Sequence, residues 1–540
     1  MKPINDIAEI QGKVSERINQ ERVKFESNSG LIQSNGRKFQ TNKPDNQPTP
    51  AQKGFNSQFV LSCLVDNEDG DARLYIELNR GKKVYDHSAG VWFIYNQHYW
   101  QEDLVEEVLR AVTEVIDIYG VEYQRQSWEY LKAQKKDDEA KAKKHSKNMA
   151  TLSKRIHDLQ TVKRKKDILT LARSGQRSLG ITGEEWDRDP MVLGCLNGVV
   201  NLKNGSFRPG KPKDYIKKIA PTSWRGLKEP APQWGSFLNS IFNGHVELIT
   251  FIQKLFGYAI TGKTSEHVFP IFWGQGRNGK STLFETLASV LGPLTGSMEA
   301  EIILKQAFNK NPGAPSPEIM ALRGKRLVWF SESNEGRRID AGKLKLLSGG
   351  DTLTGRDPYA RRQVNFRPTH KIFLLTNNRP KVDTSDYALW ARLSLIPFTL
   401  AFVPEPDPTK PNERRSDKDL PEKLKAESSG ILAWAVQGSL SWIRDGLNPP
   451  EIVKAAIQEY REEEDLITHF IKETCKIGPD YKVKAGELYK AYQQWSSQMG
   501  LNPMNATRFG KELKKRFDYD DTSNYVFYKG IGLLDTSDSF

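Results

Sequence analysis

The sequence predicts an α/β fold, because short apolar runs that read as buried strands each end in a polar loop. These runs are Val268–Trp273, Leu327–Phe330 and Lys371–Thr376. From Ser281 onward, apolar side chains instead recur at the spacing of an amphipathic helix. A buried strand that leads through a glycine-rich turn into such a helix is typical of the α/β class, and the other two runs supply further strands.

The turn after the first strand has the spacing of a phosphate-binding P-loop, with Gly274 and Gly279 followed by Lys280 and Ser281. Glycines let the backbone turn so that its N–H groups face a polyphosphate, and the helix N-terminus adds partial positive charge. We expect Lys280 to reach the β- and γ-phosphates of ATP and the Ser281 hydroxyl to hold Mg²⁺. A plain glycine-rich turn is the alternative, which the flanking strand and helix disfavour. The predicted nucleotide-binding residues are Gly274, Gln275, Gly276, Arg277, Asn278, Gly279, Lys280, Ser281 and Thr282.

A P-loop needs an acid that helps to hold Mg²⁺ and polarises the attacking water. The second apolar run ends at Ser331-Glu332, so Glu332 is the candidate catalytic base and a metal ligand; Glu335 lies further into the loop and fits less well. The third run ends at Asn377, which is well placed to orient water against the γ-phosphate. Asn377–Pro380 could be only a turn, but its place third in the series P-loop, acid, Asn argues against that.

Two basic features accompany these motifs. Arg392 is a candidate arginine finger, which would stabilise charge on the phosphoryl group transferred in a neighbouring subunit. An ordinary structural salt bridge explains the same residue, and the sequence leaves both open. In Lys343–Arg362, turn residues flanked by basic and β-prone residues predict a hairpin that projects from the sheet.

Length and charge limit the class of protein. A chain of 540 residues is too long for one core, so two to four domains are expected. The net charge of +13 favours a polyanionic partner, although such a balance also serves solubility. Cys63, Cys195 and Cys475 match no metal or redox spacing, which suggests reduced thiols. With no signal peptide and no apolar run near 18 residues, a soluble cytoplasmic protein without a membrane partner is expected.

The N-terminal third mixes strand and helix patterns. Arg73–Leu78 and Val91–Tyr95 predict strands of a small β module. The acidic cluster Asp66–Asp71 is interpreted as a solvated loop rather than a metal site, because no His accompanies it. Residues 103–173 are expected to be helical. The basic stretch Lys132–Lys166 fits a solvated helix as well as a nucleic-acid contact.

The remaining composition shifts divide the chain into regions. Asn197–Gly205 predicts a β-hairpin ahead of the P-loop domain. The predicted regions are 1–58, a charged helix and flexible linker; 59–180, the β module and basic helices; 181–256, a region leading into the core; 257–402, the P-loop core; 403–464, a helical lid and linker; and 465–540, a small C-terminal domain.

The C-terminal domain, 465–540, alternates helices with a final aromatic strand, Tyr525–Tyr528. Thr507 is a plausible N-cap of a helix whose Phe509 and Leu513 face inward, with basic residues on the opposite side. Such a fold, closing with a β-wing, is winged-helix-like and would bind nucleic acid. A small helical lid with ordinary surface lysines is the alternative. The basic residues assigned to DNA here are Arg508, Lys511, Lys514 and Lys515.

Taken together, the order of motifs resembles the superfamily III helicases, in particular the poxvirus-type and phage or plasmid primase-helicase branch. The matching segments are Gly274–Thr282, Phe330–Arg338, Lys345–Asp351, Thr376–Pro380 and Trp390–Phe398.

The resemblance implies an AAA+-like core that assembles as a homo-hexamer and uses ATP and Mg²⁺. Such a ring would translocate on single-stranded DNA, 3′ to 5′, and unwind forked duplex during replication of a phage, plasmid or other mobile element, with a primase or polymerase acting in trans. By this resemblance Lys280, Ser281, Glu332, Asn377 and Arg392 take the roles argued above. The implied DNA contacts in the pore are Lys345, Arg356, Arg361 and Arg362.

Two departures from the family pattern matter. Many relatives carry two adjacent acids where this chain has Ser331-Glu332, so one acid would have to serve both metal and water. The first 180 residues lack the paired acids and His of a primase, so a helicase without priming is expected. Two other classes remain: an ATP-switched DNA-binding initiator or loader, and a small-molecule P-loop kinase, for which the sequence suggests no acceptor site.

Overall fold

The computed structural model describes residues 54–306, 314–332, 336–359, 363–384, 386–521 and 525–534, without the Glu332 side chain. All elements named below belong to the unit Phe55–Phe540. The helix and linker predicted for residues 1–58 lie, up to residue 53, outside this part of the chain. Across the described ranges, no helix combines the length and the apolar character that crossing a membrane requires.

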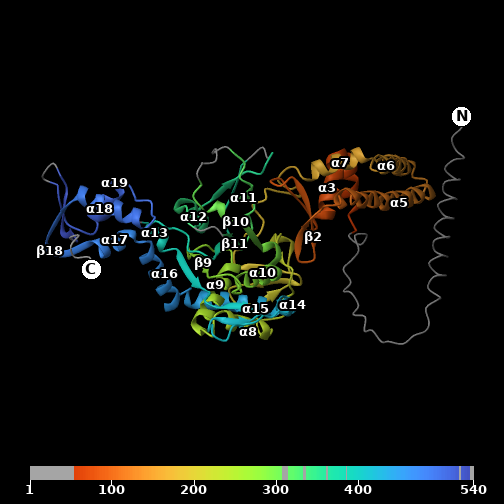
Figure 1. Ribbon diagram of the computed structural model, residues 1–540. Coiled ribbons are helices and arrows are strands. Elements are labelled where there is room, and N and C mark those ends of the chain that lie inside the picture. Colours follow the sequence, from red (N-terminus) through yellow and green to blue (C-terminus); the bar gives the residue numbers. More distant parts are fainter. Residues whose placement is uncertain are drawn as a thin grey trace. The chain divides into compact units, whose positions relative to one another are not determined.

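A five-stranded parallel sheet carries the apolar runs of the sequence (Figure 1). Its strand order is β10-β11-β14-β9-β15. The strands are β9 Phe269–Trp273, β10 Thr295–Glu299, β11 Leu327–Glu332, β14 Lys371–Thr376 and β15 Leu393–Pro397. All three predicted strands are therefore confirmed, and so is the α/β class.

Helices cover both faces of this sheet, which explains why its other strands are mainly apolar, whereas the edge strand β10 is mostly polar. Successive residues of a strand point to opposite faces. Phe272 and Phe373 accordingly lie in one core, and Ile271 and Leu374 in another. Helices of the first core are α8 Pro232–Ile241, α9 Val246–Ile260, α10 Lys280–Leu291, α14 Leu420–Ala426 and α15 Ser428–Asp445. Those of the second are α11 Pro317–Met320, α12 Ala341–Ser348, α13 Tyr387–Trp390 and α16 Glu451–Glu464.

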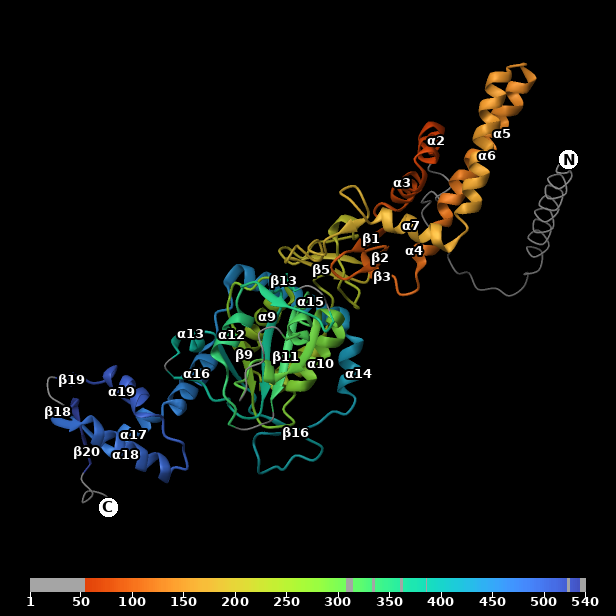
Figure 2. The same cartoon turned by 90° about the horizontal axis from the view of Figure 1, so that it is seen from above.

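Helices dominate the N-terminal region. Helices α5 and α6 run side by side as a long hairpin (Figure 2). The helices are α2 Ser57–Val65, α3 Asn67–Asn79, α4 Glu107–Arg110, α5 Thr113–Lys135, α6 Glu139–Asp158 and α7 Val162–Ala172. The β module is a small sheet of order β3-β2-β1-β4, from β1 Lys83–Asp86, β2 Val91–Asn96, β3 Tyr99–Glu102 and β4 Gly180–Ile181. The helical prediction for 103–173 is confirmed.

The strand predicted at Arg73–Leu78 is wrong, because this segment lies inside α3. Its buried apolar residues are Leu74, Tyr75 and Leu78, and this spacing places them on one side of a helix. A run of six residues is short enough to fit both the helical and the strand period of apolar residues. Packing against the neighbouring helices therefore decided its conformation.

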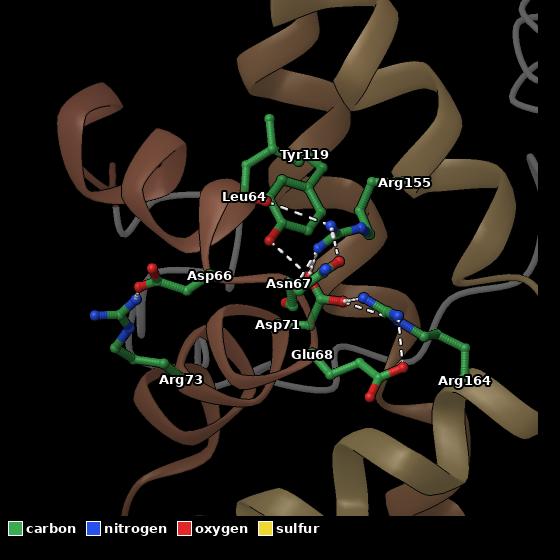
Figure 3. Close-up of polar contacts among 9 residues, drawn as sticks. All are labelled: Leu64, Asp66, Asn67, Glu68, Asp71, Arg73, Tyr119, Arg155 and Arg164. Carbon is green, nitrogen blue, oxygen red and sulfur yellow. Dashed lines mark hydrogen bonds and ion pairs between the residues drawn. The ribbon is translucent and has the colours of Figure 1, made fainter.

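The solvated loop predicted for the acidic cluster is also wrong. Asp71 has no exposed surface, and its carboxylate accepts hydrogen bonds from Tyr119, Arg155 and Arg164, each with a contact of 2.7 Å (Figure 3). Arg164 also pairs with Glu68 at 2.7 Å. Two guanidinium groups compensate the buried charge, so the cluster ties α3 to α5, α6 and α7.

Short strands complete the middle of the chain. The hairpin predicted at Asn197–Gly205 is confirmed, since β6 pairs antiparallel with β5 and with β7. This sheet has the order β7-β6-β5-β8, from β5 Val192–Cys195, β6 Gly198–Asn201, β7 Phe207–Arg208 and β8 Ile219–Ala220. Two further pairs are β12 Leu353–Gly355 with β13 Val364–Phe366, and β16 Ala401–Val403 with β17 Glu413–Arg415. The 3₁₀ turns are η2 Pro212–Asp214, η3 Gly292–Leu294 and η4 Ala300–Ile302.

The C-terminal domain runs helix, strand, helix, helix, strand, strand, and its sheet has the order β18-β20-β19. Phe509 and Leu513 are buried, as predicted. The N-cap prediction is wrong: Asn505, not Thr507, accepts the hydrogen bond from the Arg508 N–H at 2.9 Å. The elements are α17 Leu466–Thr474, β18 Cys475–Lys484, α18 Ala485–Gln498, α19 Ala506–Lys514, β19 Tyr519–Asp520 and β20 Phe527–Leu533.

Candidate nucleotide-binding site

The P-loop, the acid and the Asn follow strands that end at one edge of the sheet. Trp273, the last residue of β9, pairs in register with Thr376 of β14, which pairs with Glu332 of β11. Gly274 then donates its N–H to the Thr376 carbonyl at 3.2 Å. Because parallel strands present their carboxyl ends together, residues remote in sequence meet here.

The P-loop has a backbone that requires glycine at its last position. Gly279 has φ +87°, and a Cβ built on it would lie 2.6 Å from Cγ2 of Ile241. The buried Asn278 braces the turn, since its amide donates to the Gln275 carbonyl and its oxygen accepts from the Lys280 N–H at 3.4 Å. The loop is therefore held in shape by its own side chains before α10 begins.

Lys280 lies inside this loop and is only 7% exposed. Its ammonium donates to the Gly274 carbonyl at 2.5 Å and to Oδ1 of Asn377 at 3.4 Å. Burial lowers the pKa of Lys280 to about 8, because these neutral partners do not replace the lost hydration of the charge. Two residues that the sequence assigned to one site thus touch each other, although 97 positions separate them.

The remaining P-loop residues are open to solvent or lie at the start of α10. Gln275, Gly276 and Arg277 are exposed, and so is Ser281 in the first helical turn. The Arg277 carbonyl accepts a hydrogen bond of 2.6 Å from the Phe402 N–H, which fixes the outer side of the loop. Exposed N–H groups, a helix N-terminus and a hydroxyl form a donor set that fits a polyphosphate with Mg²⁺.

Glu332 is the last residue of β11, the strand next to β14, which Asn377 follows. This is the place predicted for the acid. The roles predicted for its carboxylate concern atoms outside the described part of the chain and stay predictions. The same holds for Glu335.

Arg392 lies at the other end of the sheet, directly before β15. Its carbonyl accepts from the Phe269 N–H at 2.6 Å, at the start of the P-loop strand. Its guanidinium donates to the His267 carbonyl at 3.4 Å. Arg392 is therefore remote from Lys280 of the same chain, and as an arginine finger it could serve only another copy.

The predicted pore hairpin is displaced along the sequence. Lys343–Ser348 belongs to α12, and the antiparallel pair begins only at Leu353. Lys345 pairs with Asp386 at 2.7 Å. Arg356 follows β12 directly, where its N–H donates to the Ser316 hydroxyl at 3.2 Å. Arg361 and Arg362 lie outside the described residues.

The basic residues of α19 have mixed surroundings. Arg508 pairs with Asp383 of the P-loop core at 2.7 Å, and Lys515 pairs with Glu512 at 2.6 Å. The Lys514 ammonium lies 4.1 Å from the centre of the Tyr519 ring. Lys511 is exposed.

Arg379 lies beside the site, and its role was not predicted from the sequence. Its guanidinium lies 4.1 Å from the ring centre of Trp273, the residue before the P-loop. On α16, Glu463 pairs with it at 2.5 Å and Glu459 at 3.4 Å. The Asn-Asn-Arg-Pro motif contained the signal, because a half-buried Arg two positions after Asn377 can hold both strand ends in place.

Three protein families match separate parts of the chain. A family described as "D5 N terminal like" matches residues 72–243 and one described as "Poxvirus D5 protein-like" matches 462–529. Between them, a family of unknown function (DUF5906) matches 272–392, which includes the P-loop and Arg392.

Proteins of large DNA viruses are similar to this chain in sequence. "Putative helicase L207/L206" of Acanthamoeba polyphaga mimivirus is 26% identical over 75% of this chain and 43% of its own length. "Putative helicase 022R" of Frog virus 3 is 23% identical over 58% and 39%, and "Putative primase C962R" of African swine fever virus (strain Badajoz 1971 Vero-adapted) is 24% identical over 61% and 35%. The chain thus spans less than half the length of these relatives. Among solved structures, the apo C-terminal region of NrS-1 shows 12% identity and a TM-score of 0.47, covering 86% of this chain and 99% of that one.

The fold and the families together define the class, an α/β protein with D5-type regions on both sides of a P-loop sheet. More particularly, the chain fits the poxvirus D5-type primase-helicase branch. The family resemblance predicted from the motifs is confirmed.

Proposed function

We propose that this chain is an ATP-dependent DNA helicase with an AAA+-like superfamily III core, which moves along single-stranded DNA and unwinds duplex. The observation that carries the proposal is the contact between Lys280 and Asn377 at the sheet edge where β9, β14 and β11 end. The strand with the Asn lies directly beside the P-loop strand, and the strand with Glu332 lies next to it. This strand order supports the expectation that a cation, an amide and an acid serve one phosphate position.

In this proposal the chain's own side chains and N–H groups bind the nucleotide and activate the water. Lys280 exchanges its carbonyl partners for phosphate oxygens, and the N–H groups at the start of α10 hold the rest of the polyphosphate. Asn377 orients water, and Glu332 takes its proton. Ser281 and Glu332 are the groups that would hold Mg²⁺, which, when bound, neutralises phosphate charge. Arg379 holds the strand ends that position Asn377.

The position of Arg392 fits a ring better than a single copy. A finger at the opposite end of the sheet can reach a γ-phosphate only in a neighbouring chain, which is the expectation for a homo-hexamer. The β12–β13 hairpin and Arg356 would then contact DNA phosphates in the pore. The C-terminal domain, whose element order is that of a winged helix, adds a second DNA contact through α19.

ATP turnover with and without oligonucleotide tests the proposal. We expect single-stranded DNA to stimulate hydrolysis, a forked duplex to be separated, and Lys280→Ala to abolish both activities, while Lys305→Ala, outside the loop, leaves them unchanged. Near-normal turnover in Lys280→Ala would refute the P-loop assignment. Equal turnover with and without DNA, together with ATP-dependent DNA binding, would favour the initiator or loader instead.

Deletion of residues 466–540 tests the C-terminal contact. DNA affinity should fall more than basal ATP turnover, because α19 and its basic residues leave while the nucleotide site stays. The reverse result would indicate a structural lid.

A further inference from the structure

The C-terminal sheet has an outer face that neither the family matches nor the role of α19 explains. In β18 and β20, Val483 pairs with Tyr528, and both are buried against α18 and α19. Side chains alternate along a strand. The flanking register pairs, Lys482 with Lys529 and Lys484 with Phe527, therefore point away from that core.

Lysine ammonium groups and aromatic rings lie against one another on this outer face. The Lys482 ammonium lies 4.6 Å from the centre of the Phe527 ring, and the Lys484 ammonium lies 4.2 Å from that of Tyr525. Tyr525 is 60% exposed, and Lys529 is exposed as well. Such contacts keep the rings and the charges together in one patch.

The charge on this face is positive on balance. It carries Lys482, Lys484 and Lys529 against two carboxylates. Asp520 lies opposite Phe527 and 3.6 Å from Lys482, and the exposed Asp518 lies beside Lys529, whose N–H its carbonyl accepts at 2.8 Å. A hollow beside Tyr525 is lined in part by Lys484 and Lys490 and also by Glu487. A polyanion is therefore the complementary partner.

The aromatic rings narrow the choice of polyanion. In single-stranded nucleic acid the base faces are available for stacking, whereas in a duplex they are covered by neighbouring base pairs. An acidic peptide would pair with the lysines but has no general use for an exposed Tyr525 ring beside the half-buried ring of Phe527. An open sheet face with cations beside rings matches the binding of an unpaired strand.

The outer face is separate from the α19 contact. Phe509 and Leu513 of α19 pack in the inner core, and the Tyr528 hydroxyl donates to the Gly510 carbonyl at 3.2 Å. The helix and the lysine–aromatic face thus lie on opposite sides of the sheet, so a ligand on one does not cover the other.

We propose that the outer face of the β18-β20-β19 sheet binds single-stranded DNA, with bases stacked on Tyr525 and Phe527 and phosphates held by Lys482, Lys484 and Lys529. The inference rests on the proposed function only in taking DNA as the polymer. It adds a strand-binding site next to the α19 site and requires no ATP.

Fluorescence anisotropy of a short labelled oligothymidylate with the full chain, without nucleotide, tests the proposal. The double variant Tyr525→Leu with Phe527→Leu keeps apolar volume but removes both rings, and its Kd should rise by about 5-fold or more per ring. Lys529→Gln, at an exposed position, should lower the slope of log K against log salt by about 0.7. Tyr387→Leu, an exposed ring on α13, is the matched control and should bind like the wild type.

Unchanged oligothymidylate affinity in both the ring variant and Lys529→Gln would overturn the inference. A loss of affinity for duplex DNA alone would also overturn the inference. So would polyglutamate that competes with oligothymidylate as well as unlabelled oligothymidylate does, if the ring variant has no effect. Strand separation and ATP turnover are measured separately. If the wild-type protein unwinds DNA and the ring variant binds oligothymidylate as tightly as the wild type, only this site is refuted. Absent unwinding with ring-dependent oligonucleotide binding refutes only the proposed motor.

Discussion

Replacing Lys280 by Met should stabilise the protein while abolishing ATP turnover. The ammonium is buried among neutral oxygens, and its pKa falls from 10.5 to about 8. A difference of about 2.5 pKa units corresponds to about 3 kcal/mol of unfolding free energy that the charge costs at pH 7. Met has a similar shape and no charge, although the carbonyl of Gly274 and the amide of Asn377 lose a donor, at about 1 kcal/mol each. The net expectation is a gain of about 1–2 kcal/mol.

The pH dependence supplies a second, sharper readout. Between pH 8 and 10.5 the unfolded chain binds a proton at Lys280 that the folded chain has released, so wild-type stability rises with pH in this window. Below about pH 8 the buried charge lowers the free energy of unfolding by its full amount, and above about pH 10.5 this destabilisation is gone. Other groups that titrate there cancel when wild type and Lys280→Met are compared, so the gap between them should shrink as pH rises.

Urea unfolding followed by tryptophan fluorescence measures this gap. The control is Lys305→Met, a replacement at an exposed lysine, for which the gap should stay near zero at every pH. If Lys280→Met is less stable than wild type at pH 7, or if the gap is the same at pH 7 and pH 10.5, the argument from a buried, poorly compensated ammonium is refuted.

Three further changes test the site. Gly279→Ala should lower the free energy of unfolding by about 2–4 kcal/mol in urea, because a Cβ at φ +87° adds strain and meets Ile241; Gly276→Ala, with open space around it, should be nearly neutral, and equal effects would contradict this reasoning. Arg379→Ala should reduce single-turnover ATP hydrolysis about 10-fold while nucleotide affinity stays within about 3-fold, because the strand end that carries the Asn loses its anchor; a loss of affinity instead would assign Arg379 to binding. Arg392→Ala should bind nucleotide and lose turnover, and mixing it with Glu332→Gln chains should restore part of the activity; no recovery at any mixing ratio would favour the structural role.

Local patterns predicted well which strand, loop and helix carry the candidate nucleotide site. The P-loop joins a strand and a helix that are adjacent in sequence, so spacing alone indicates its shape. Asn377 was predicted from its place after a buried strand, and the structure brings it against Lys280. In the C-terminal domain, helical spacing predicted the buried positions of Phe509 and Leu513. The long strand β18 was not predicted, and the final strand lies at Phe527–Leu533 rather than at Tyr525–Tyr528.

Residues whose surroundings come from other elements were predicted less well. Asp71 looked like part of a solvated loop, since its arginine partners lie 84 and 93 positions away. The ion pair of Lys345 with Asp386, which joins α12 to the start of α13, was not predicted, and the assignment of Lys345 to DNA stays a prediction. Arg379 received no role, because Trp273, Glu459 and Glu463 lie on two other elements.

The sequence by itself determined the α/β class, the P-loop and the family, since these depend on residues a few positions apart. Only the tertiary structure decided which remote groups meet: Asn377 beside Lys280, Arg392 at the far end of the sheet, and lysines against rings on the outer C-terminal face. The physical reason is that strand order and register set these contacts, and both arise from burying apolar faces across the whole chain.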